Sequence, residues 1–374
     1  MDPIKLASIE TFAFRVPTEP IKVSFGTFRD RPCVLVRVVD VDGREGWGEV
    51  WCNWPAAGAE YRARLATDIG ERLIGRTLSS PEEAFHALTK EMEVLVLQTG
   101  ESGPIAAAIA GIDIAIWDLS ARREGVPLYR HLGGANTQSV PVYATGINPD
   151  LPEEFAAARY REGHRAFKLK IGFGRELDVK NLANMRKALG NQAKLMCDAN
   201  QALSLEAAIA LSREIAPSNL SWIEEPLRVD SPTSDWQALA VASPIELAGG
   251  ENFQGDQFGG AIAGKVYGVL QPDVTKWGGI TGNIRVGRAT VAAGKRYCPH
   301  YFGGGIALLA SLHLLAAAGG EGLLEFDCHP NAGREMVVGS MLPVHDGRVP
   351  VPADPGLGSI PDLRALARYR TWPQ

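Results

Sequence analysis

The chain has 374 residues, 45% of them hydrophobic and 22% charged, and its formal net charge is −5. This composition is typical of an ordered globular protein, and the length fits two domains or one large barrel with additions. Because 38 Lys and Arg residues stand against 43 Asp and Glu residues, the basic surface of a general nucleic-acid binder is not expected. The five cysteines form no Cys-x-x-Cys pair, so neither a disulfide framework nor a zinc site is indicated.

The two longest apolar tracts are Ile105–Trp117 and Ile306–Ala318, and each is interrupted by a polar residue. Both are shorter than the roughly 20 residues that span a bilayer. Residues 1–5 also lack the apolar stretch of a signal peptide. We therefore expect a cytoplasmic protein whose partners include neither a membrane nor a nucleic acid.

The first third of the chain mixes strand and helix signals. Residues Cys33–Val41 are rich in β-branched side chains, and a turn signal follows them. At Ser80 a capping residue is followed by a proline and two acids, which predicts the start of a helix. The Ala-rich stretch Ile105–Arg123 predicts another long helix, ended by a Gly-Val-Pro sequence.

From about residue 139 onward, short apolar runs alternate with helical segments, which predicts βαβ units and a parallel sheet. Eight runs have the character of strands: Val140–Ala144, Phe167–Ile171, Lys194–Cys197, Ser221–Ile223, Ile245–Ala248, Gly268–Leu270, Arg296–Cys298 and Leu323–Phe326. Eight strands at this period favour a barrel over an open sheet. The glycine clusters at 172–174 and 303–305 match neither a dinucleotide fingerprint nor a phosphate-binding loop, so we interpret them as loops.

Charged residues stand at the ends of the second to the eighth predicted strands. They are Lys168 and Lys170, Asp198, Glu224, Glu251, Asp273, His300 and Glu325. In a parallel barrel the carboxyl ends of the strands meet at one face, where the active sites of barrel enzymes lie. The charged positions therefore indicate an active site rather than a solvated surface.

Three of these residues, Asp198, Glu224 and Glu251, follow successive strands and are called the carboxylate trio below. Neighbouring carboxylates repel one another unless a cation neutralises them, and hard oxygen ligands with room for water or substrate suit Mg²⁺. A structural ion pair would explain any one of the acids alone, but it explains all three less well. The sequence thus predicts that the trio binds Mg²⁺.

Lys168 and Lys170 are separated by one residue on a predicted strand, so their side chains share a face. Two neighbouring ammonium groups lower each other's pKa, which makes an amine a usable base near neutral pH. A solvent-facing strand edge is the alternative. Asp273 and His300 end the sixth and seventh strands, where the carboxylate can hold the imidazole in position and raise its basicity.

In this order the residues resemble the enolase superfamily, and within it the mandelate racemase subgroup. The matching pieces are Phe167-Lys168-Leu169-Lys170, Asp198-Ala199-Asn200, Trp222-Ile223-Glu224-Glu225-Pro226, Gly250-Glu251-Asn252, Gln271-Pro272-Asp273, Lys276-Trp277-Gly278-Gly279, Pro299-His300 and Leu324-Glu325. The resemblance implies an α/β fold with an N-terminal α+β capping domain (1–130) and a modified TIM barrel, (β/α)7β (139–345). A C-terminal segment (346–374) would return to the cap, and a homo-oligomer, a dimer or an octamer, is expected.

The resemblance also implies a role for each charged residue at the barrel mouth. The carboxylate trio would bind Mg²⁺, which would chelate the carboxylate of a small-molecule substrate. Lys170 would be one acid/base, with Lys168 beside it. The Asp273–His300 pair would act on the opposite face, and Glu325 would hydrogen-bond the substrate carboxylate or the enediolate. Because the muconate lactonising subgroup carries a lysine where Asp273 stands, that subgroup is disfavoured.

Two reactions fit these roles. Removal of an α proton on one face and its return on the other gives racemisation or epimerisation, whereas expulsion of a β-hydroxyl gives dehydration. We expect dehydration of an acid sugar, an aldonate or aldarate, to a 2-keto-3-deoxy acid. A racemase or epimerase of an α-hydroxy acid and a non-catalytic carboxylate-binding barrel stay open. A lyase for phosphorylated substrates is less favoured, because Glu325 would repel phosphate.

Substrate contacts are expected from the cap, chiefly from a loop at Pro17–Pro32 and from the segment Trp51–Tyr61. The candidate substrate-binding residues are Lys22, Arg29, Arg31, Trp51 and Asn200. The three basic residues of the loop could pair with the distal carboxylate of a diacid sugar. The alternative is that they are solvated loop residues.

Overall fold

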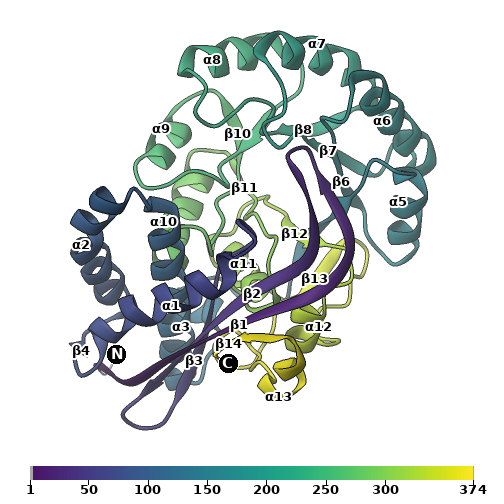
Figure 1. The fold of residues 1–374 in the computed structure, drawn as a ribbon. Helices are drawn as coiled ribbons and strands as arrows, with labels where there is room; N and C mark the ends of the chain where they lie inside the picture. Colours follow the sequence, from purple (N-terminus) through teal and green to yellow (C-terminus); the bar gives the residue numbers. More distant parts are fainter. Residues whose placement is uncertain (1–2, 374) are drawn as a thin grey trace.

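The computed structural model describes residues 3–373, which form an N-terminal cap and a C-terminal barrel (Figure 1). The cap contains β1 (Ile4–Val23), β2 (Gly26–Asp40), β3 (Glu45–Val50), α1 (Gly58–Gly70), η1 (Glu71–Leu73), β4 (Thr77–Leu78), α2 (Pro81–Thr99), α3 (Ser102–Glu124) and α4 (Leu128–His131). The barrel contains β5 (Ser139–Ile147), α5 (Pro152–Arg161), β6 (Ala166–Lys170), α6 (Arg175–Leu189), β7 (Lys194–Asp198), α7 (Leu205–Ile215), η2 (Ala216–Ser218), β8 (Leu220–Glu224), α8 (Thr233–Ala242), β9 (Leu247–Gly249), α9 (Gln257–Ala263), β10 (Tyr267–Leu270), α10 (Gly279–Ala292), β11 (Arg296–Tyr297), α11 (Gly305–Ala318) and β12 (Leu324–Asp327). The C-terminal segment contains α12 (Ala332–Val338), β13 (Arg348–Pro350), α13 (Leu363–Leu366), η3 (Ala367–Tyr369) and β14 (Arg370–Trp372).

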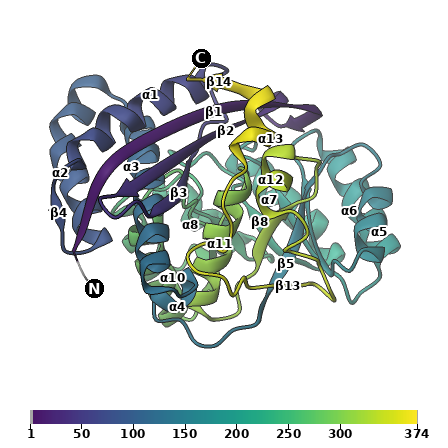
Figure 2. The same ribbon diagram turned by 90° about the horizontal axis from the view of Figure 1, so that it is seen from below.

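The cap is an antiparallel sheet in the order β14-β1-β2-β3, with α1 and α3 packed against it (Figure 2). Helix α2 begins as the sequence predicts, because the Ser80 hydroxyl accepts a hydrogen bond from the backbone N–H of Glu83. Helix α3 ends at Gly125, which has a φ of 70°. The two helix signals read from the first third of the chain are therefore confirmed.

Helix α3 has 23 residues and is long and apolar enough to cross a membrane, by length and composition alone. The apolar tract Ile105–Trp117 is itself shorter than a membrane span, but the helix that contains it extends beyond the tract at both ends. However, 89% of its most apolar window is buried inside the protein, and the helix packs against β3, α1, α2 and α10. A helix covered on all sides is apolar all round, which explains its composition.

Strands β1 and β2 form one long hairpin that reaches over the barrel (Figure 1). The prediction of a loop at Pro17–Pro32 is wrong, because strand pairing continues as far as Val23 and Gly26. The register shifts between Pro17 and Ile21, the stretch of β1 that contains Pro17 and Pro20. Proline fits there because β14 pairs with β1 at residues 13–14, before the prolines, so no partner needs their missing N–H groups on that side.

All eight predicted barrel strands are present as β5 to β12, and they run parallel in the order β11-β10-β9-β8-β7-β6-β5-β12. Helices α5 to α11 alternate with them and lie outside the sheet (Figure 1). The ends of the curled sheet meet where the N–H of Leu323 donates to Sγ of Cys298. This is the predicted (β/α)7β order of a modified TIM barrel.

An apolar layer fills the interior of the barrel. Its members are Tyr143, Ala166, Met196, Trp222, Ala248, Val269, Cys298 and Leu323. Because side chains alternate across a strand, residues two positions further along also point inward. Those positions hold Thr145, Lys168, Asp198, Glu224, Gly250, Gln271, His300 and Glu325. The apolar layer therefore supports a polar layer at the carboxyl ends of the strands.

The C-terminal segment contacts both parts of the molecule. Strand β13 pairs antiparallel with β5 of the barrel, and β14 pairs antiparallel with β1 of the cap. The chain thus returns from the barrel to the cap at its end. The exact domain boundaries at residues 130, 139 and 345 stay predictions.

Candidate active site

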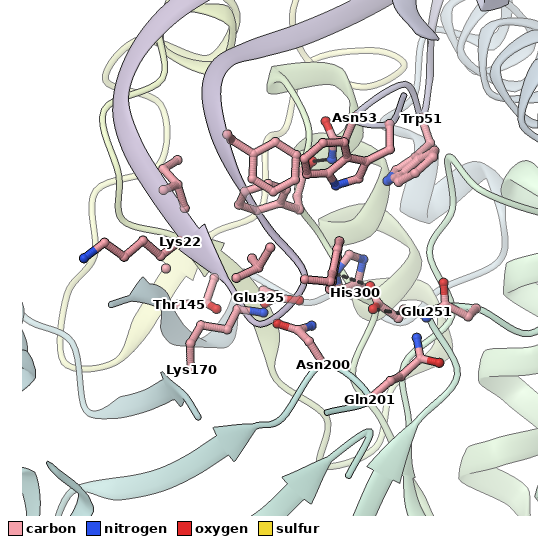
Figure 3. Close-up of a pocket in the computed structure, with 18 of the residues that line it drawn as sticks. Lys22, Trp51, Asn53, Thr145, Lys170, Asn200, Gln201, Glu251, His300 and Glu325 are labelled. Atoms are coloured by element: carbon pink, nitrogen blue, oxygen red, sulfur yellow. Dashed lines mark hydrogen bonds and ion pairs between the residues drawn. The ribbon is translucent and has the colours of Figure 1, made fainter. Parts of the chain in front are cut away.

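A cavity of about 250 Å³ lies between the carboxyl ends of the barrel strands and the cap (Figure 3). The barrel lines it with Lys170, Asn200, Glu251, Lys276, His300 and Glu325. The cap lines it with Ile21, Val23, Phe25, Phe28, Trp51 and Trp54. Charged side chains from separate strands thus share one space with the tip of the β1–β2 hairpin.

The two lysines of β6 both point at the carboxylate trio. Nζ of Lys170 lies 2.5 Å from Oδ2 of Asp198. Nζ of Lys168 lies 2.6 Å from Oε1 of Glu224 and 3.7 Å from Oδ2 of Asp198. Lys168 is fully buried, whereas Lys170 lines the cavity. Lys170 is therefore the lysine that can reach a substrate bound there.

The predicted lowering of the lysine pKa values is wrong for this arrangement. Burial is the largest single effect and lowers the pKa of Lys170, and Lys168 lowers it further, but Asp198 and Glu224 together raise it, so the pKa ends above its ordinary value. Burial also lowers the pKa of Lys168, while Glu224 and Glu325 raise it well above that value. Two neighbouring ammonium groups lower each other's pKa, but the carboxylates that hold them here raise it by more.

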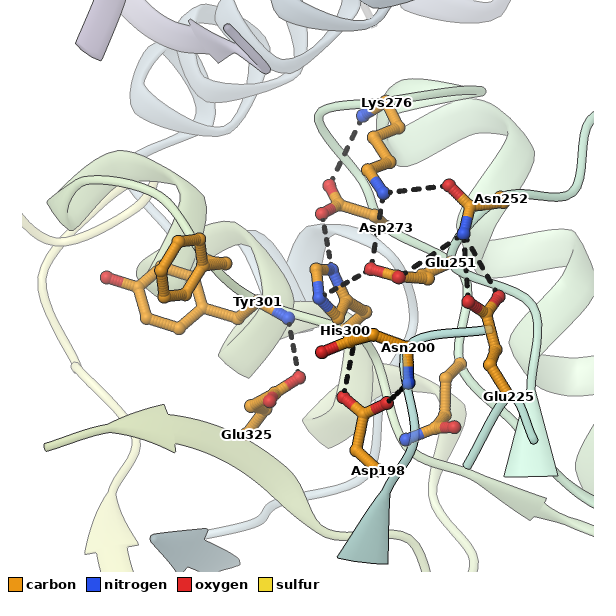
Figure 4. A network of polar contacts seen from close by, with 12 residues as sticks. Asp198, Asn200, Glu225, Glu251, Asn252, Asp273, Lys276, His300, Tyr301 and Glu325 are labelled. Atoms are coloured by element: carbon orange, nitrogen blue, oxygen red, sulfur yellow. Dashed lines mark hydrogen bonds and ion pairs between the residues drawn. The ribbon is translucent and has the colours of Figure 1, made fainter. Parts of the chain in front are cut away.

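Asp273 and His300 are in contact, as the sequence predicts (Figure 4). Nδ1 of His300 lies 2.7 Å from Oδ2 of Asp273, while Oδ1 of Asp273 accepts hydrogen bonds from the N–H and the hydroxyl of Thr275. Nε2 of His300 lies 2.7 Å from Oε2 of Glu251. Burial lowers the pKa of His300, but Glu251, Glu325 and the hydrogen bond with Asp273 raise it well above its ordinary value. His300 therefore holds a proton at Nε2.

Glu325 is fixed from two sides. Its Oε1 lies 2.8 Å from Nζ of Lys168, and its Oε2 accepts a hydrogen bond from the N–H of Tyr301 at 3.0 Å. Burial raises the pKa of Glu325, but Lys168 and His300 lower it overall. A charged carboxylate is thus held in place at the cavity wall.

The carboxylate trio suits a divalent cation by its chemistry, although each member here pairs with an ammonium or imidazole group. No three His, Cys, Asp or Glu side chains among residues 3–373 surround a common metal position. Burial and the neighbouring Asp198 raise the pKa of Glu224 to about 7. Oδ1 of Asn200, whose N–H and Nδ2 donate to Asp198, is buried with no hydrogen-bond partner among the described residues. Carboxylates this close together are stabilised by a compensating positive charge. Because their oxygen atoms are the ligands that Mg²⁺ prefers, the trio fits this ion.

Two residues that belong to the matching motifs, but for which no role in the site was predicted, hold the third member of the trio. Nζ of Lys276 lies 3.2 Å from Oε2 of Glu251 and 3.1 Å from Oδ1 of Asn252. Nδ2 of Asn252 donates to both carboxylate oxygens of Glu225, so this buried glutamate faces Asn252 (Figure 4). The available signal for Lys276 was its place three residues after Asp273, at the same barrel end.

Two of the predicted substrate-binding residues line the cavity from fixed positions. Asn200 follows β7 and is held by Asp198. The ring of Trp51 lies 5.0 Å from Nζ of Lys276, and the N–H of Trp51 donates to the carbonyl of Thr275. The segment after β3 is therefore anchored to the barrel at the cavity.

The three basic residues of the hairpin do not converge on the cavity. Lys22 lines its mouth, but its Nζ pairs with Asp150 at 2.7 Å, and in Figure 3 it points away from His300. Arg29 is exposed and is not among the residues that line the cavity. Arg31 is buried and is also not among them. Both arginines lie on strand β2 rather than in a loop, and neither lines this cavity. Their contact with substrate therefore stays a prediction that the geometry does not support.

Arg31 is instead part of a buried ion pair. Its guanidinium lies 2.7 Å from Oδ2 of Asp327, with the two side chains 4% and 0% exposed, and it stacks at 3.8 Å on the ring of Phe302. We expect Arg31→Ala to lower the free energy of unfolding by about 3–5 kcal/mol, because it leaves a buried carboxylate unpaired. Arg29→Ala should change it by less than about 0.5 kcal/mol. Denaturant unfolding measures both. An Arg31→Ala variant of normal stability with a raised KM would show instead that Arg31 binds substrate.

Comparison with known proteins covers almost the whole chain. The family described as "Mandelate racemase / muconate lactonizing enzyme, N-terminal domain" matches residues 8–133, and "Enolase C-terminal domain-like" matches residues 150–365. D-galactarolactone cycloisomerase of Agrobacterium fabrum is 32% identical over 94% of each chain. Arabinonate dehydratase of Saccharolobus solfataricus is 29% identical over 87% of each chain. Other relatives include further acid sugar dehydratases and an N-succinyl-L-Arg/Lys racemase.

Solved structures give the same result. A mandelate racemase/muconate lactonizing enzyme from Bordetella bronchiseptica is 48% identical, covers 98% of this chain and 99% of its own, and has a TM-score of 0.92. A racemase from Streptomyces coelicolor with bound magnesium is 27% identical over 98% of this chain and all of its own, with a TM-score of 0.87. The chain therefore belongs to the mandelate racemase/muconate lactonizing enzyme family of the enolase superfamily.

Proposed function

We propose that this protein is a Mg²⁺-dependent dehydratase that removes the proton α to the carboxylate of an acid sugar and expels the β-hydroxyl as water. The product is a 2-keto-3-deoxy acid. The observation that carries the proposal is one cavity lined by both an amine, Lys170, and an imidazole, His300, beside the carboxylate trio. A base for one proton and an acid for the leaving hydroxyl are what an elimination requires.

The two groups reach a substrate from different strands of the barrel, because Lys170 ends β6 and His300 follows β11 (Figure 3). Lys170 accepts the α proton at Nζ in its neutral form, after it has left its ion pair with Asp198 and released its own proton to solvent. His300, with its Nδ1 held by Asp273, donates the proton at Nε2 to the departing hydroxyl. Lys168 stays charged below the cavity and stabilises the negative charge that develops on the enediolate.

The residues that would hold Mg²⁺ are Asp198, Glu224 and Glu251. When bound, the ion supplies positive charge that neutralises the trio and stabilises the negative charge of the substrate carboxylate as its α proton leaves. The buried Oδ1 of Asn200 adds an acceptor at the same place. The bound magnesium described for one structural relative supports this assignment.

Removal of divalent cations is expected to abolish activity, and Mg²⁺ should restore it. Glu251→Gln should weaken Mg²⁺ binding at least about tenfold in calorimetric titration, because an amide replaces a charged ligand. Glu225→Gln is the matched control, since burial raises the pKa of Glu225 well above its ordinary value and its oxygens face Asn252. Equal affinities in both variants, or full activity in EDTA, would contradict the assignment.

The cap side of the cavity favours a substrate with a neutral far end. The rings of Phe28 and Trp54 lie 4.7 Å apart, those of Phe28 and Phe302 lie 5.3 Å apart, and Phe25 stands at the hairpin tip. Aromatic faces pack against the C–H groups of a sugar chain or ring. Of the three basic residues of the hairpin, only Lys22 lines the cavity, and its Nζ is paired with Asp150. We therefore propose an aldonate or its cyclic form before an aldarate.

Isomerisation is the second candidate, for two reasons. Acid/base groups on separate strands can also remove and return a proton, which gives racemisation or epimerisation. The curated relatives also include cycloisomerases of a galactarolactone and of a 3,6-anhydro-galactonate. In such a substrate the group expelled from the β carbon is a ring oxygen in place of water.

Proton NMR in D₂O with Mg²⁺ tests these reactions across aldonates, aldarates, their lactones and anhydro sugar acids. A new keto group beside a deuterated methylene, formed from an open-chain acid, supports the dehydratase. The same product from a lactone or anhydro sugar only would support the cycloisomerase. Loss of the α-proton signal with an unchanged skeleton would mean racemisation or epimerisation, and no change with any compound would contradict the proposal.

A further inference from the structure

Two barrel helices begin without a capping side chain of their own. Helix α10 follows Gly278, which has a φ of 80°, and α11 follows Gly304; neither glycine position supplies a side-chain cap. The first N–H groups of a helix have no partner within the helix, and a Ser, Thr, Asp or Asn side chain usually accepts from them. Both helix starts are buried, so these groups need acceptors from elsewhere in the protein.

The acceptors come from the cap. The carboxylate of Glu49, at the end of β3, accepts hydrogen bonds from the N–H of Gly304 at 2.5 Å and of Ala307 at 2.9 Å. The carboxylate of Asp113, in α3, accepts from the N–H of Thr281 at 3.0 Å and from its hydroxyl at 2.7 Å. Negative charge at a helix N-terminus is also favoured by the helix dipole. Each cap carboxylate therefore replaces the missing capping residue of one barrel helix.

Glycines make room for these carboxylates on the barrel side. A Cβ at Gly303 would lie 2.7 Å from an oxygen of Glu49, and one at Gly279 would lie 2.3 Å from an oxygen of Asp113. These are closer than a side chain can approach. The absence of a Cβ is thus what allows each carboxylate to reach the helix start.

A second set of glycines holds Glu49 and Asp113 together as one unit. A Cβ at Gly48 would lie 1.9 Å from the carbonyl oxygen of Gly111, and one at Gly46 would lie 2.2 Å from that of Ala115. Strand β3 therefore lies directly on helix α3. The two carboxylates extend from this rigid pair of elements toward the barrel.

The helices that these carboxylates hold are the two that follow Asp273 and His300. The loop from Asp273 to α10 carries Thr275, which donates two hydrogen bonds to Asp273. The loop from His300 to α11 is residues 301–304. It ends at Gly304, whose N–H donates a hydrogen bond to the carboxylate of Glu49. A shift of either helix start would therefore move the loop that carries one partner of the pair.

We propose that Glu49 and Asp113 are positioning residues for the Asp273–His300 pair, acting by capping α11 and α10 from the other domain. The proposal rests on the proposed function, in which Lys170 takes the α proton and His300 donates a proton to the leaving hydroxyl. Lys170 lies on β6, away from both capped helices, so its placement does not depend on these contacts. The expected signature is a defect confined to the step that His300 serves, the expulsion of the hydroxyl.

The test measures two rates on the best substrate by NMR in D₂O with the Mg²⁺-loaded full chain. The first is the total loss of the α proton, by exchange or reaction, which needs Lys170; the second is formation of the dehydrated product, which needs Lys170 and His300. Glu49→Ala and Asp113→Ala should slow product formation about tenfold or more, because a displaced catalytic group loses its alignment. The total loss of the α proton should stay within about twofold of the wild type. Glu49→Gln and Asp113→Asn keep an acceptor oxygen and should restore most of the loss.

The matched control is Asp118→Ala. Asp118 is a buried carboxylate of the same helix α3, but it accepts from the N–H groups of Trp47 and Leu357 rather than from a barrel helix. Its loss should slow both rates equally or neither. If the alanine variants do not fold, Glu49→Asp, which keeps the charge and shortens the reach, should show the same selective loss of product formation. Equal loss of both rates, or no loss, in folded Glu49 and Asp113 variants overturns the proposal, whereas a wild type that neither loses the α proton nor forms product overturns the proposed function itself.

Discussion

Replacing Lys170 by alanine should lower kcat by about 10²–10⁴-fold, the range that a positioned acid/base group contributes. Lys170 lines the cavity and meets Asp198 at 2.5 Å, so it is placed to take a proton from a substrate beside the carboxylate trio. Steady-state kinetics measure the loss, and calorimetry should show that Mg²⁺ still binds. Small alkylamines added to the variant should restore part of the rate, because they can occupy the space that the side chain leaves.

The matched control for this variant is Lys187→Ala, which removes an exposed lysine on α6 and should leave kcat unchanged. A Lys170→Ala enzyme with full activity would show that the base lies elsewhere. Loss of Mg²⁺ binding together with activity would mean that Lys170 acts by holding Asp198, and would remove it from the reaction.

The second large effect is expected at His300. His300→Asn should lower kcat by about 10²–10⁴-fold, because no proton is then available where Nε2 now holds one. Asp273→Asn should also lower it, since Asp273 holds Nδ1 at 2.7 Å and so fixes which nitrogen faces the cavity. The double variant should be little worse than His300→Asn alone, because residues that act as a unit are not additive.

His86→Asn serves as the control for this pair, since His86 is an exposed histidine on α2. Kinetics of the wild type, the two single variants and the double variant complete the cycle. Effects of Asp273→Asn and His300→Asn that multiply in the double variant would mean that Asp273 does not act through His300.

The barrel could be predicted because each strand repeats one pattern. An apolar residue such as Met196 or Trp222 points inward, and two positions later Asp198 or Glu224 does the same. Inward-facing side chains recur at every second residue of a strand, and each βα repeat contributes one strand. Both features are local, so the sequence alone shows which charged residues share the barrel mouth.

The cap contacts could not be predicted, because they depend on which distant segments meet. Pro17 suggested a loop, yet the strand continues past it, with Pro17 opposite Asp30 of β2. Arg31 looks like a substrate contact until Asp327, almost 300 residues later, is seen to pair with it. The pKa of Lys170 likewise depends on a carboxylate from another strand.

The contact of Glu49 with the barrel also could not be predicted from the sequence. Its place in Gly46-Trp47-Gly48-Glu49 was evident from the sequence, but nothing local indicates that it meets the start of a helix about 255 residues away. The alternating glycines indicate a close approach only when the partner helix is known. Contacts between the cap and the barrel therefore could not be predicted from the sequence, and only the structure shows them.

The most direct single measurement is the Mg²⁺-dependent exchange of the substrate α proton with solvent deuterium, followed by NMR in the wild type and in the Lys170→Ala, His300→Asn double variant. We predict exchange or a deuterated product in the wild type only when Mg²⁺ is present, and none in the double variant. Exchange that continues in EDTA, or that persists in a folded double variant, would contradict the assignment of this cavity as the site of α-proton abstraction.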